Sequence, residues 1–412
     1  MILSQLFYPE LVSTGQTLTE LAEELINQGA QVNVICGQST HVDRVSITPK
    51  FICYKGINIR RVYSTRLNKF NIFFKMINQI TYSLSLIFHL IRDKNPKIIL
   101  VFTNPSFAAF IVAFFRKFGG SPYIFTIYDV HPDAAYKMGM LKRNGIIVKV
   151  WDFLNQIAFK YASAVVVLGR CMAEKMRSPR KIGKTHKKLI HIINIWSDDK
   201  IIRKIESNNN KYIAKWDLGN KFVVGYSGNL GAFHDLETIM ETAKQLHDKE
   251  DIIFVFIGEG YKKTWCMEYA NKFGLINCQF HGYVDRNDLA LSHSLMDVGL
   301  VSLSLGQEGL SVPSKMYGIL AAETPVIAVM SEKTETAKVL FENSCGKVVN
   351  PGASKELKNE IMYFYDNPNE KIKMGKNGRK AVNDKYNVRV SASKYIDLIN
   401  SISNNKKLER KC

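Results

Sequence analysis

The sequence predicts an α/β protein made of two tandem Rossmann-like domains, and three observations support this prediction. Short apolar runs alternate with segments of helical periodicity, which is the pattern of a doubly wound parallel sheet. This alternation occurs twice, and a charged, Asn-rich stretch at 198–221 separates the two series. A chain of 412 residues is also too long for a single hydrophobic core.

The first series of elements spans 1–200, which we expect to form the first domain. An apolar run at 2–7 precedes a helical segment that Gly29 ends, and QVNVICG at 31–37 is the next expected strand. Helices between the strands would supply the right-handed crossovers that parallel strands require. Further expected strands lie at 97–102, 123–129 and 163–169.

The second series, at 201–385, repeats the same alternation and is expected to form the second domain. Its first helix is expected from about 235 to 246, after the first strand of the series. Residues 386–412 are expected to form a C-terminal helix that packs back on the first domain, followed by a basic tail. The expected strands are 222–228, 251–260, 277–284, 298–303 and 346–350.

The stretch at 66–94 is strongly apolar, but Lys75, Asn78, Gln79 and His89 interrupt it, so we do not expect it to span a membrane. One interpretation is a buried helix of the first domain. The other is an amphipathic helix whose exposed apolar and basic residues enter a membrane surface. The sequence leaves both interpretations open.

The net charge of +19 is concentrated in the first half, where 27 Lys and Arg residues oppose 12 Asp and Glu residues. Such a surface attracts phosphate-rich partners, namely nucleic acid, anionic lipid or a diphosphate-bearing substrate. A compositional bias toward Lys and Asn would explain the charge equally well. Because no nucleic-acid-binding module accompanies the charge, nucleic acid is not an expected partner.

The seven cysteines are scattered, with no C-x-x-C pair and no Cys/His cluster at metal-ligand spacing. This pattern indicates reduced cytosolic thiols and argues against a disulfide framework or a structural zinc. The segment MILSQLFYPE lacks the basic leader, the long apolar core and the cleavage site of a signal peptide. We therefore expect a cytoplasmic protein.

Two loops that follow expected strands carry glycine next to a helix start, as phosphate-binding turns do. Thr14 and Gly15 lie in YPELVSTGQT, where Gly15 allows close backbone approach. Gly228 and Asn229 lie in SGNLGAFHDLE. Neither loop has P-loop or G-x-G-x-x-G spacing, so a dinucleotide oxidoreductase is not expected. Ordinary turns would carry the same glycines.

Two charged residues are candidates for chemistry. Asp129 follows an expected strand, at the edge where open α/β sheets bind ligands, and His131 lies two positions later. Lys315 follows Pro313 and Ser314, an expected turn and helix N-cap. A lysine in a first helical turn opposes the helix dipole, which is explained if an anion shares the site. A solvated lysine is the alternative.

Six segments, in order along the chain, resemble family 4 glycosyltransferases of the two-Rossmann GT-B fold. They are YPELVSTGQTLTELAEELINQGAQVNVICG, YDVHPDAAYKMGML, INIWSD, VVGYSGNLGAFHDLETIM, IGEGYKK and EGLSVPSKMYGILAAETPVIA. The resemblance covers nearly the whole chain. It is nearest to the WbuB-like branch, which makes colanic acid, O-antigen and related bacterial surface polysaccharides.

This resemblance implies a retaining transferase that needs no metal or cofactor and has an interdomain cleft. The first domain would hold the acceptor, and the second a nucleotide-diphosphate sugar, with UDP favoured over GDP. The sugar would be N-acetyl-fucosamine or a related hexose of an O-antigen, capsule or exopolysaccharide. The acceptor would be a polyprenyl-diphosphate-linked saccharide at the anionic inner face of the cytoplasmic membrane. No oligomeric state is implied.

Carried over by position, the resemblance assigns Lys315 to the donor diphosphate and Asp129 to the sugar or the acceptor. These two are the expected catalytic residues, and Thr14 and His131 are assigned to the acceptor side. The other expected donor-binding residues are Gly15, Gly228, Asn229, Gly282, Tyr283, Glu308, Gly309, Leu310, Ser311, Val312 and Ser314.

The chain departs from the family pattern at several of these positions. Two glutamates that the family carries around this helix align with Leu310 and Gly318, so Glu308 or backbone groups would have to hold the ribose. Glu323 stands where the family closes the helix with glycine. Further departures are Tyr128 in place of histidine, and Asn229 and His234 in place of arginine and lysine.

Two other functions remain open from the sequence. A nucleotide-sugar 2-epimerase shares the GT-B architecture but needs acid and base groups at the sugar C2. A catalytically inactive protein that binds sugar nucleotides would fit the missing glutamates.

Overall fold

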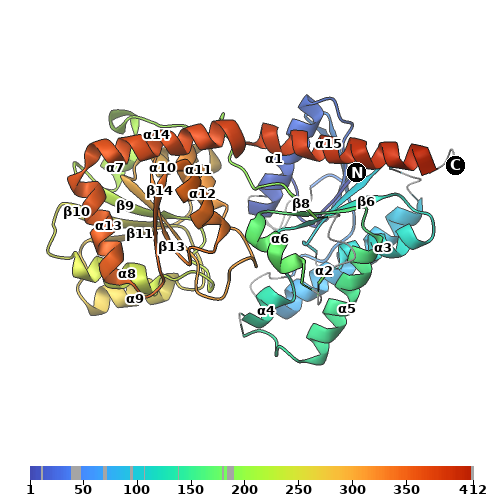
Figure 1. Cartoon of the computed structure of the whole chain (residues 1–412), viewed down its shortest axis with the longest axis horizontal. Helices are drawn as coiled ribbons and strands as arrows, with labels where there is room; N and C mark the ends of the chain where they lie inside the picture. Colours follow the sequence, from blue (N-terminus) through green and yellow to red (C-terminus); the bar gives the residue numbers. More distant parts are fainter. Residues whose placement is uncertain are drawn as a thin grey trace. The chain divides into compact units, whose positions relative to one another are not determined.

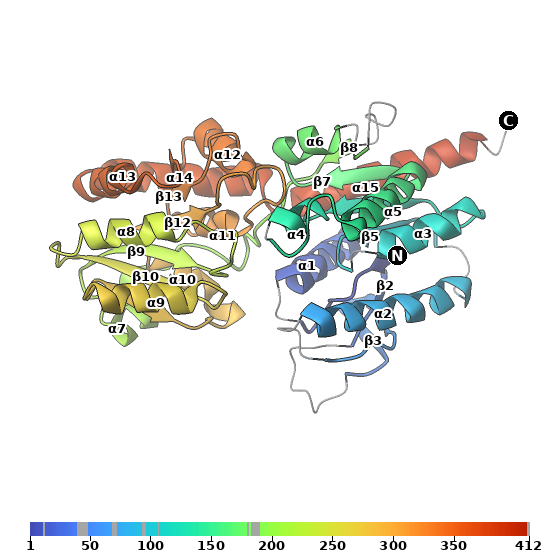
Figure 2. The ribbon, with the colours of Figure 1, turned by 90° about the horizontal axis from the view of Figure 1, so that it is seen from below.

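The computed structural model describes residues 1–10, 13–38, 48–67, 72–92, 96–105, 107–137, 139–178, 181–182 and 190–409. It divides into two compact units, Met1–Asn194 with Val388–Cys412, called unit 1 here, and Ile195–Asn387, called unit 2 (Figures 1 and 2). The expected domain boundary after residue 200 lies a few residues beyond this division. Each unit is built on a sheet of its own.

Unit 1 contains an eight-stranded sheet in the order β3-β4-β2-β1-β5-β6-β7-β8. Its neighbouring strands are parallel, except that β3 pairs antiparallel with β4. The central strands β5, β6 and β7 are buried along their whole length, which explains their uninterrupted apolar sequences. The strands are β1 (Ile2–Leu3), β2 (Asn33–Cys36), β3 (Phe51–Tyr54), β4 (Ile57–Arg61), β5 (Ile99–Phe102), β6 (Tyr123–Ile127), β7 (Ala164–Val167) and β8 (Ile190–Ile192).

Helices cover both faces of this sheet. On one face α1 (Ser13–Asn27) packs against α15 (Val388–Glu409) (Figure 1). On the other lie α2 (Ile72–Arg92), α3 (Ala108–Lys117) and α5 (Ile146–Tyr161), with the short α4 (Asp133–Lys137) and α6 (Arg170–Met176) elsewhere in the unit. The hydroxyl of Tyr395 in α15 lies 3.1 Å from Thr126 Oγ1 in β6, so this last helix is part of unit 1.

Unit 2 contains a six-stranded parallel sheet in the order β11-β10-β9-β12-β13-β14. One of its cores lies between the sheet and α8, α9 and α13. The strands are β9 (Phe222–Ser227), β10 (Ile252–Ile257), β11 (Cys278–His281), β12 (Val298–Ser302), β13 (Val326–Val329) and β14 (Gly346–Val349). The helices are α7 (Lys211–Lys215), α8 (Glu237–Gln245), α9 (Lys263–Lys272), α10 (Leu289–Ser294), α11 (Lys315–Ala321), α12 (Glu335–Asn343), α13 (Ser354–Asp366) and α14 (Pro368–Lys385), with 3₁₀ turns at Ser207–Asn209 and Arg286–Asp288.

The predicted α/β class and the two tandem parallel-sheet domains are confirmed, but two segments differ from their expected structure. The hairpin of β3 and β4 was not expected, because its side chains alternate in burial and so lack a continuous apolar run. The stretch 198–221, expected as a linker, packs in unit 2, where Tyr212 and Trp216 are buried. These two aromatic residues stand among polar ones and form no periodic apolar pattern, so the sequence did not indicate that the segment packs.

Helix α2 covers most of the apolar stretch at 66–94, of which residues 68–71 and 93–94 lie outside the described residues. Tyr82 and Leu86 are fully buried, whereas Leu84, Phe88 and Ile91 are 63%, 59% and 67% exposed. The helix therefore packs through one side and presents apolar side chains on another. None of the described helices is long and apolar enough to cross a bilayer.

Glu323 closes helix α11 in a left-handed conformation, with φ +58°. The amide of Glu323 donates to Leu320 O at 3.1 Å, and the amide of Thr324 donates to Ile319 O at 3.3 Å. These two bonds form a Schellman motif, whose first residue after the cap is usually glycine because a side chain is strained there. The backbone geometry thus explains why a small residue is expected at 323.

Candidate functional site

Lys315, the first residue of α11, lies beside the turn that follows β9. Its Nζ donates to the Tyr226 hydroxyl at 2.6 Å and to Asn229 O at 3.4 Å. A Cβ added at Gly228 would lie 3.5 Å from Lys315 Cε, so the side chain lies directly over this glycine. Three residues singled out from the sequence, Gly228, Asn229 and Lys315, are therefore brought together at the carboxyl edge of the second sheet, where open α/β sheets bind ligands.

The surroundings of Lys315 change its protonation. The side chain is partly exposed, yet desolvation lowers the pKa of Lys315 to about 7. Its Nζ also lies 3.8 Å from the centre of the Tyr226 ring, a cation–π contact. An anion that enters beside this ammonium would favour its charged form.

Tyr226 and His234 complete the polar surroundings of Lys315, and sequence reasoning did not select either as a site residue. Tyr226 is 1% exposed in β9, and its hydroxyl lies 2.8 Å from His234 Nδ1. Burial, and to a smaller extent the charge of Lys315, lowers the pKa of His234 to about 3. The sequence contained only a weak indication of this contact, because His234 was noted as a departure from the family pattern.

Close backbone packing requires glycines around this turn. A Cβ at Gly258 would lie 2.1 Å from Gly228 O, and one at Gly260 would lie 2.5 Å from Leu230 O. The φ angles of Gly258 and Gly260 are +142° and +155°. The glycines of the GEG sequence therefore allow the loops after β9 and β10 to pack closely. The sequence analysis did not predict this role.

The segment before α11 contains the other expected donor-binding residues. Glu308 Oε1 accepts from the amide of Gly306 at 3.2 Å, Gly309 has φ +70°, and Leu310 is buried. Ser311, Val312 and Ser314 are partly exposed. The expected N-cap is wrong in one respect, because Ser314 occupies the cap position in a helical conformation and its side chain makes no capping bond.

Gly318 has a packing reason to lack a side chain. A Cβ there would lie 2.9 Å from Nε2 of His293, a buried histidine of α10. A side chain at this position would require the His293 ring to shift. The glycine at 318, where the family carries a glutamate, thus leaves room for the buried ring of His293.

Gly282 and Tyr283 follow β11 and lie near the turn at Gly258. The Tyr283 hydroxyl donates to Glu259 O at 3.4 Å, and the residue is 62% exposed. Glu259 is paired with Lys263 at 2.7 Å. An exposed aromatic ring at the carboxyl edge of the sheet offers a stacking surface for a planar ligand.

The acceptor-side candidates lie in unit 1, as does Gly15, which was predicted to bind the donor. Asp129 is exposed after β6, and it lines, with His131 and Trp151, a cavity of about 10 Å³, room for about one water molecule. His131 stacks on Trp151 with ring centres 5.4 Å apart. Gly15 lies in α1, where a Cβ would come within 2.8 Å of Glu10 Cβ, and Thr14 precedes it in the same helix.

A buried ion cluster supports the loop that carries Asp129 and His131. Lys181 is 5% exposed and pairs with Asp133 and, at 3.0 Å, with Asp152. Burial alone would raise the pKa of Asp133. The hydrogen bonds from Lys181 and Tyr136 together outweigh this effect, so the pKa is lowered. Asp133 is thus held in an internal ion pair with Lys181.

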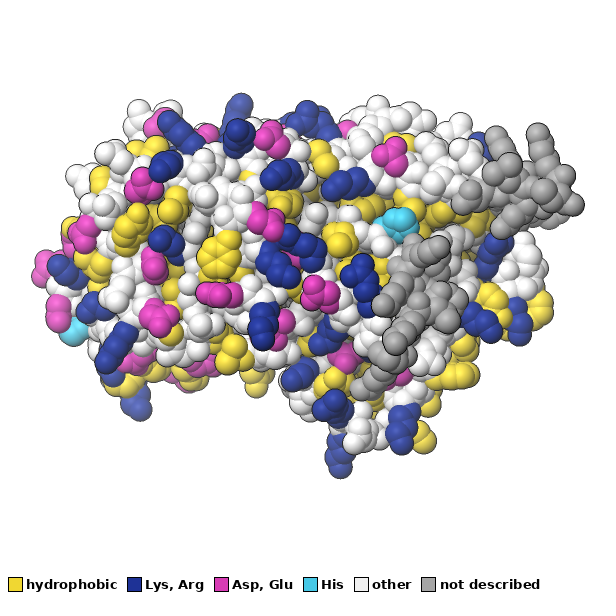
Figure 3. Space-filling view, viewed as in Figure 1, with side chains coloured by type: hydrophobic (Ala, Val, Ile, Leu, Met, Phe, Trp, Pro, Cys, Tyr) yellow, Lys and Arg dark blue, Asp and Glu magenta, His cyan; other side chains and the backbone are white. Residues whose placement is uncertain are grey.

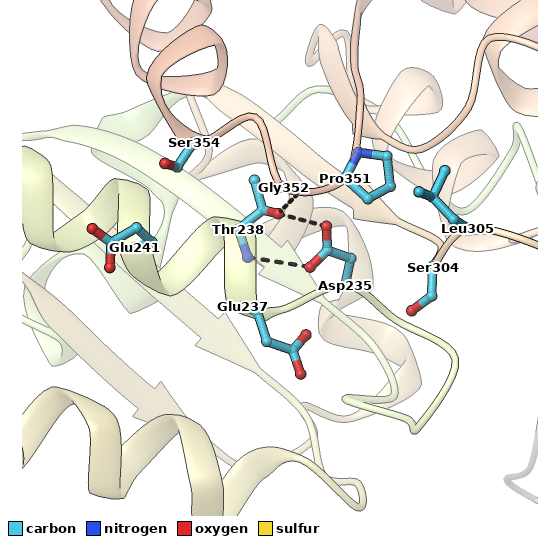
Figure 4. A pocket seen from close by; sticks show the side chains of 9 residues that line it. All are labelled: Asp235, Glu237, Thr238, Glu241, Ser304, Leu305, Pro351, Gly352 and Ser354. Atoms are coloured by element: carbon cyan, nitrogen blue, oxygen red, sulfur yellow. Dashed lines mark hydrogen bonds between the residues drawn. The ribbon is translucent and has the colours of Figure 1, made fainter. Parts of the chain in front are cut away.

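A cavity in unit 2, about 380 Å³, lies beside the start of α8 (Figure 4). Its carboxylates already have partners: Asp235 accepts from Thr238, Glu237 pairs with Lys262, and Glu241 accepts from Tyr269. Across the described ranges, no group of three or more His, Cys, Asp or Glu side chains is placed to hold a metal ion. The other residues that line this cavity are Ser304, Leu305, Pro351, Gly352 and Ser354.

Comparison with known proteins gives matches over both units. Residues 14–190 match the model of the glycosyl transferase 4-like domain, and residues 208–381 match that of glycosyl transferases group 1. The probable glycosyltransferase WbjE of Pseudomonas aeruginosa is 27% identical over 259 residues, which are 62% of this chain and 62% of that protein. The match thus spans less than two thirds of the WbjE protein.

Two further similarities extend over more of the chain. The putative colanic acid biosynthesis glycosyl transferase WcaI of Escherichia coli K12 is 23% identical over 356 residues, 81% of this chain and 83% of that protein. The structure of Anabaena Alr3699/HepE in complex with UDP has a TM-score of 0.72 and 14% identity, over 97% of this chain and 99% of that one. At this identity the structural likeness shows the fold alone.

Proposed function

Because the chain consists of a glycosyl transferase 4-like domain followed by a group 1 glycosyl transferase domain in the GT-B fold, we propose that it transfers a sugar from a nucleotide-diphosphate donor. The observation that carries this proposal is the position of Lys315 over Gly228 and beside Asn229 O. A cation at the carboxyl edge of a parallel sheet, beside a glycine turn without a side chain, suits a diphosphate.

The donor is proposed to lie against unit 2. Lys315 and the Gly228–Asn229 turn hold the diphosphate, and the segment from Glu308 to Ser314 lies along it. The exposed ring of Tyr283, next to Gly282, borders the base. UDP is the proposed nucleotide, which is consistent with the UDP held by the Anabaena Alr3699/HepE structure.

The proposed reaction retains the configuration at the sugar C1. The bond between C1 and the donor phosphate oxygen breaks, and the acceptor hydroxyl forms the new bond on the same face. The acceptor proton passes to the leaving phosphate oxygen. The chain positions the reactants, and the Lys315 ammonium stabilises the negative charge that develops on the diphosphate. No step requires a metal ion.

The acceptor is proposed to lie against unit 1, near Thr14, Asp129 and His131. Asp129 is exposed after β6, where its carboxylate can accept hydrogen bonds from sugar hydroxyls or orient the attacking one. The relationship to WbjE and WcaI supports a saccharide acceptor of a bacterial surface polysaccharide. A polyprenyl-diphosphate-linked saccharide and an N-acetyl-fucosamine-type donor remain the finer predictions.

Unit 1 is further proposed to dock on an anionic membrane through the apolar face of α2, α3 and α5. Helices α2 and α3 contain no acidic residue, and α5 contains one, Asp152, which is buried against Lys181. Figure 3 shows apolar and basic side chains together at the lower right, where α5 lies. Apolar side chains beside Lys and Arg match a bilayer surface of anionic lipid. This face comprises Leu84, Phe88, Ile91, Phe114, Phe118, Ile147, Val150 and Phe153, which are between 51% and 69% exposed.

A thermal-shift screen of UDP, GDP and their sugar conjugates tests the donor proposal. A ligand that binds only the folded state raises the melting temperature, so UDP and one UDP-sugar should raise it. No shift with any nucleoside diphosphate or its sugars would contradict the proposal. Incubation with UDP-N-acetylglucosamine and no acceptor separates a 2-epimerase, which converts it, from a transferase, which does not epimerise it. Tight UDP binding without transfer to any saccharide acceptor would favour the inactive binding protein.

A further inference from the structure

The hydroxyl of Tyr226 is the centre of a small hydrogen-bond network in unit 2. It accepts from Lys315 Nζ at 2.6 Å, and two acceptors are within reach of its own proton, His234 Nδ1 at 2.8 Å and Asn229 O at 3.2 Å. A phenol has one proton to donate. Burial raises the pKa of Tyr226, so the phenol keeps that proton. The direction of the network depends on which acceptor takes it.

The backbone fixes the tautomer of His234. The amide of Gly231 donates to His234 Nδ1 at 3.1 Å. A backbone amide can only donate, so Nδ1 must carry a lone pair, and the proton of the neutral ring must lie on Nε2. The Gly231 amide and the Tyr226 hydroxyl then share the single lone pair of Nδ1. The hydroxyl lies closer to Nδ1, at 2.8 Å, than to Asn229 O, at 3.2 Å, which favours His234 as the acceptor of the phenol proton. The lowered pKa of His234 agrees with a neutral ring.

We propose that Tyr226 and His234 are positioning residues for Lys315, through a directed relay from Lys315 Nζ to the Tyr226 hydroxyl and from that hydroxyl to His234 Nδ1. The His234 lone pair draws the phenol proton away from Lys315, so the phenol oxygen presents its own lone pair to the ammonium. The ammonium is thereby held over Gly228. This inference rests on the proposed role of Lys315 in diphosphate binding.

The relay also explains the histidine at position 234. The family lysine at this position would add a second cation to the site. A neutral histidine adds no charge and instead orients the Tyr226 hydroxyl that holds Lys315. Lys262, which lies beside His234, is paired with Glu237 at 2.8 Å.

Two measurements on the full chain test the relay. The first is a ¹⁵N spectrum of the histidine rings in the unliganded protein at neutral pH, with the His234 signals assigned by their loss in His234→Gln. We expect a neutral ring protonated at Nε2. A charged ring, or one protonated at Nδ1, would overturn the proposal whether or not the protein binds UDP.

The second measurement is UDP affinity by calorimetry in Tyr226→Phe, with Tyr269→Phe as the matched control. The Tyr269 hydroxyl donates to Glu241, away from Lys315. We expect Tyr226→Phe to weaken UDP binding about tenfold, since a hydrogen bond to a charged group is lost. Because the ammonium loses an acceptor, UDP binding should also be lost at a lower pH than in the parent chain. Unchanged affinity and pH dependence in Tyr226→Phe, with UDP bound by the parent, would overturn the relay. Failure of the parent itself to bind UDP would count against the donor proposal instead.

Discussion

Lys315 extends over Gly228, so that a methyl group added to this glycine would lie 3.7 Å from the lysine Nζ. Gly228 has φ +124°, a conformation that favours glycine, and follows β9 directly. The two residues are far apart in the chain but meet at the carboxyl edge of the same sheet. In the proposed donor site, this pair places the lysine cation over a turn that carries no side chain.

UDP binding should depend on pH through Lys315, whose pKa is lowered to about 7 by burial. Only the protonated amine attracts the diphosphate, so affinity should fall as the pH rises through this value. The titratable groups that face the amine are Tyr226, which stays protonated, and His234, which stays neutral. Calorimetry at pH values above 7, in buffers of different ionisation enthalpy, should reveal proton uptake on UDP binding. Absence of proton uptake above that pKa would contradict this assignment.

Glu323→Gly should stabilise unit 2. The left-handed φ of +58° costs a residue with a side chain roughly 1 kcal/mol, and glycine avoids this cost. Thermal unfolding should show an increase in melting temperature of about 2–4 °C. Glu323→Ala is the control, because it removes the carboxylate but keeps the strained Cβ. Equal stability of the two variants would show that the backbone conformation is not the source of the strain.

Lys181→Met should destabilise unit 1, because it leaves Asp133 and Asp152 buried without their cation. The expected loss of unfolding free energy is about 3 kcal/mol or more, measured by urea denaturation at neutral pH. Lys55→Met provides the contrast: Lys55 pairs with Glu23 on the surface, and its loss should cost less than about 1 kcal/mol. Since the pKa of Asp133 is lowered, its contribution is present above the unfolded value of 3.8 and is lost on acidification. A similar cost for both variants would argue against a buried ion cluster.

The Leu84→Gln/Phe88→Gln variant should lose affinity for membranes. Both side chains lie on the exposed apolar face of α2. Full burial of each in a bilayer would stabilise binding by about 1.5–3 kcal/mol. In co-sedimentation, the parent chain should bind vesicles that contain phosphatidylglycerol and should bind weakly to phosphatidylcholine alone. Ile276→Gln, which removes an apolar side chain that is 87% exposed in unit 2, is the control. Unchanged sedimentation of the α2 variant would exclude this face as the docking surface.

The sequence predicted the fold well because parallel strands covered on both faces leave continuous apolar runs. β5, β10 and β12 all follow this rule. The hairpin of β3 and β4 was not predicted, because strands at the exposed edge of a sheet need no continuous apolar run. α2 gave two interpretations because a helix with a wide apolar surface has the same pattern whether that surface faces a core or a membrane.

The candidate site was predicted in part. Lys315, Gly228 and Asn229 could be selected because a lone cation and glycine turns depart from the apolar pattern around them. Tyr226 could not, because an aromatic residue in an apolar strand is indistinguishable from a core residue until its hydroxyl partners are known. Glu323 was singled out because the family closes this helix with glycine, but only the structure shows the left-handed φ that explains this preference.

The affinity of Lys315→Ala for UDP tests most directly whether Lys315 forms the diphosphate site. Calorimetry should give a dissociation constant at least tenfold weaker than that of the parent chain, because a charge-assisted contact is removed. Lys272→Ala, which removes an exposed lysine at the end of α9, has the same net charge and should bind UDP as the parent does. Equal UDP affinity in Lys315→Ala and the parent, with unchanged melting temperatures, would contradict the account.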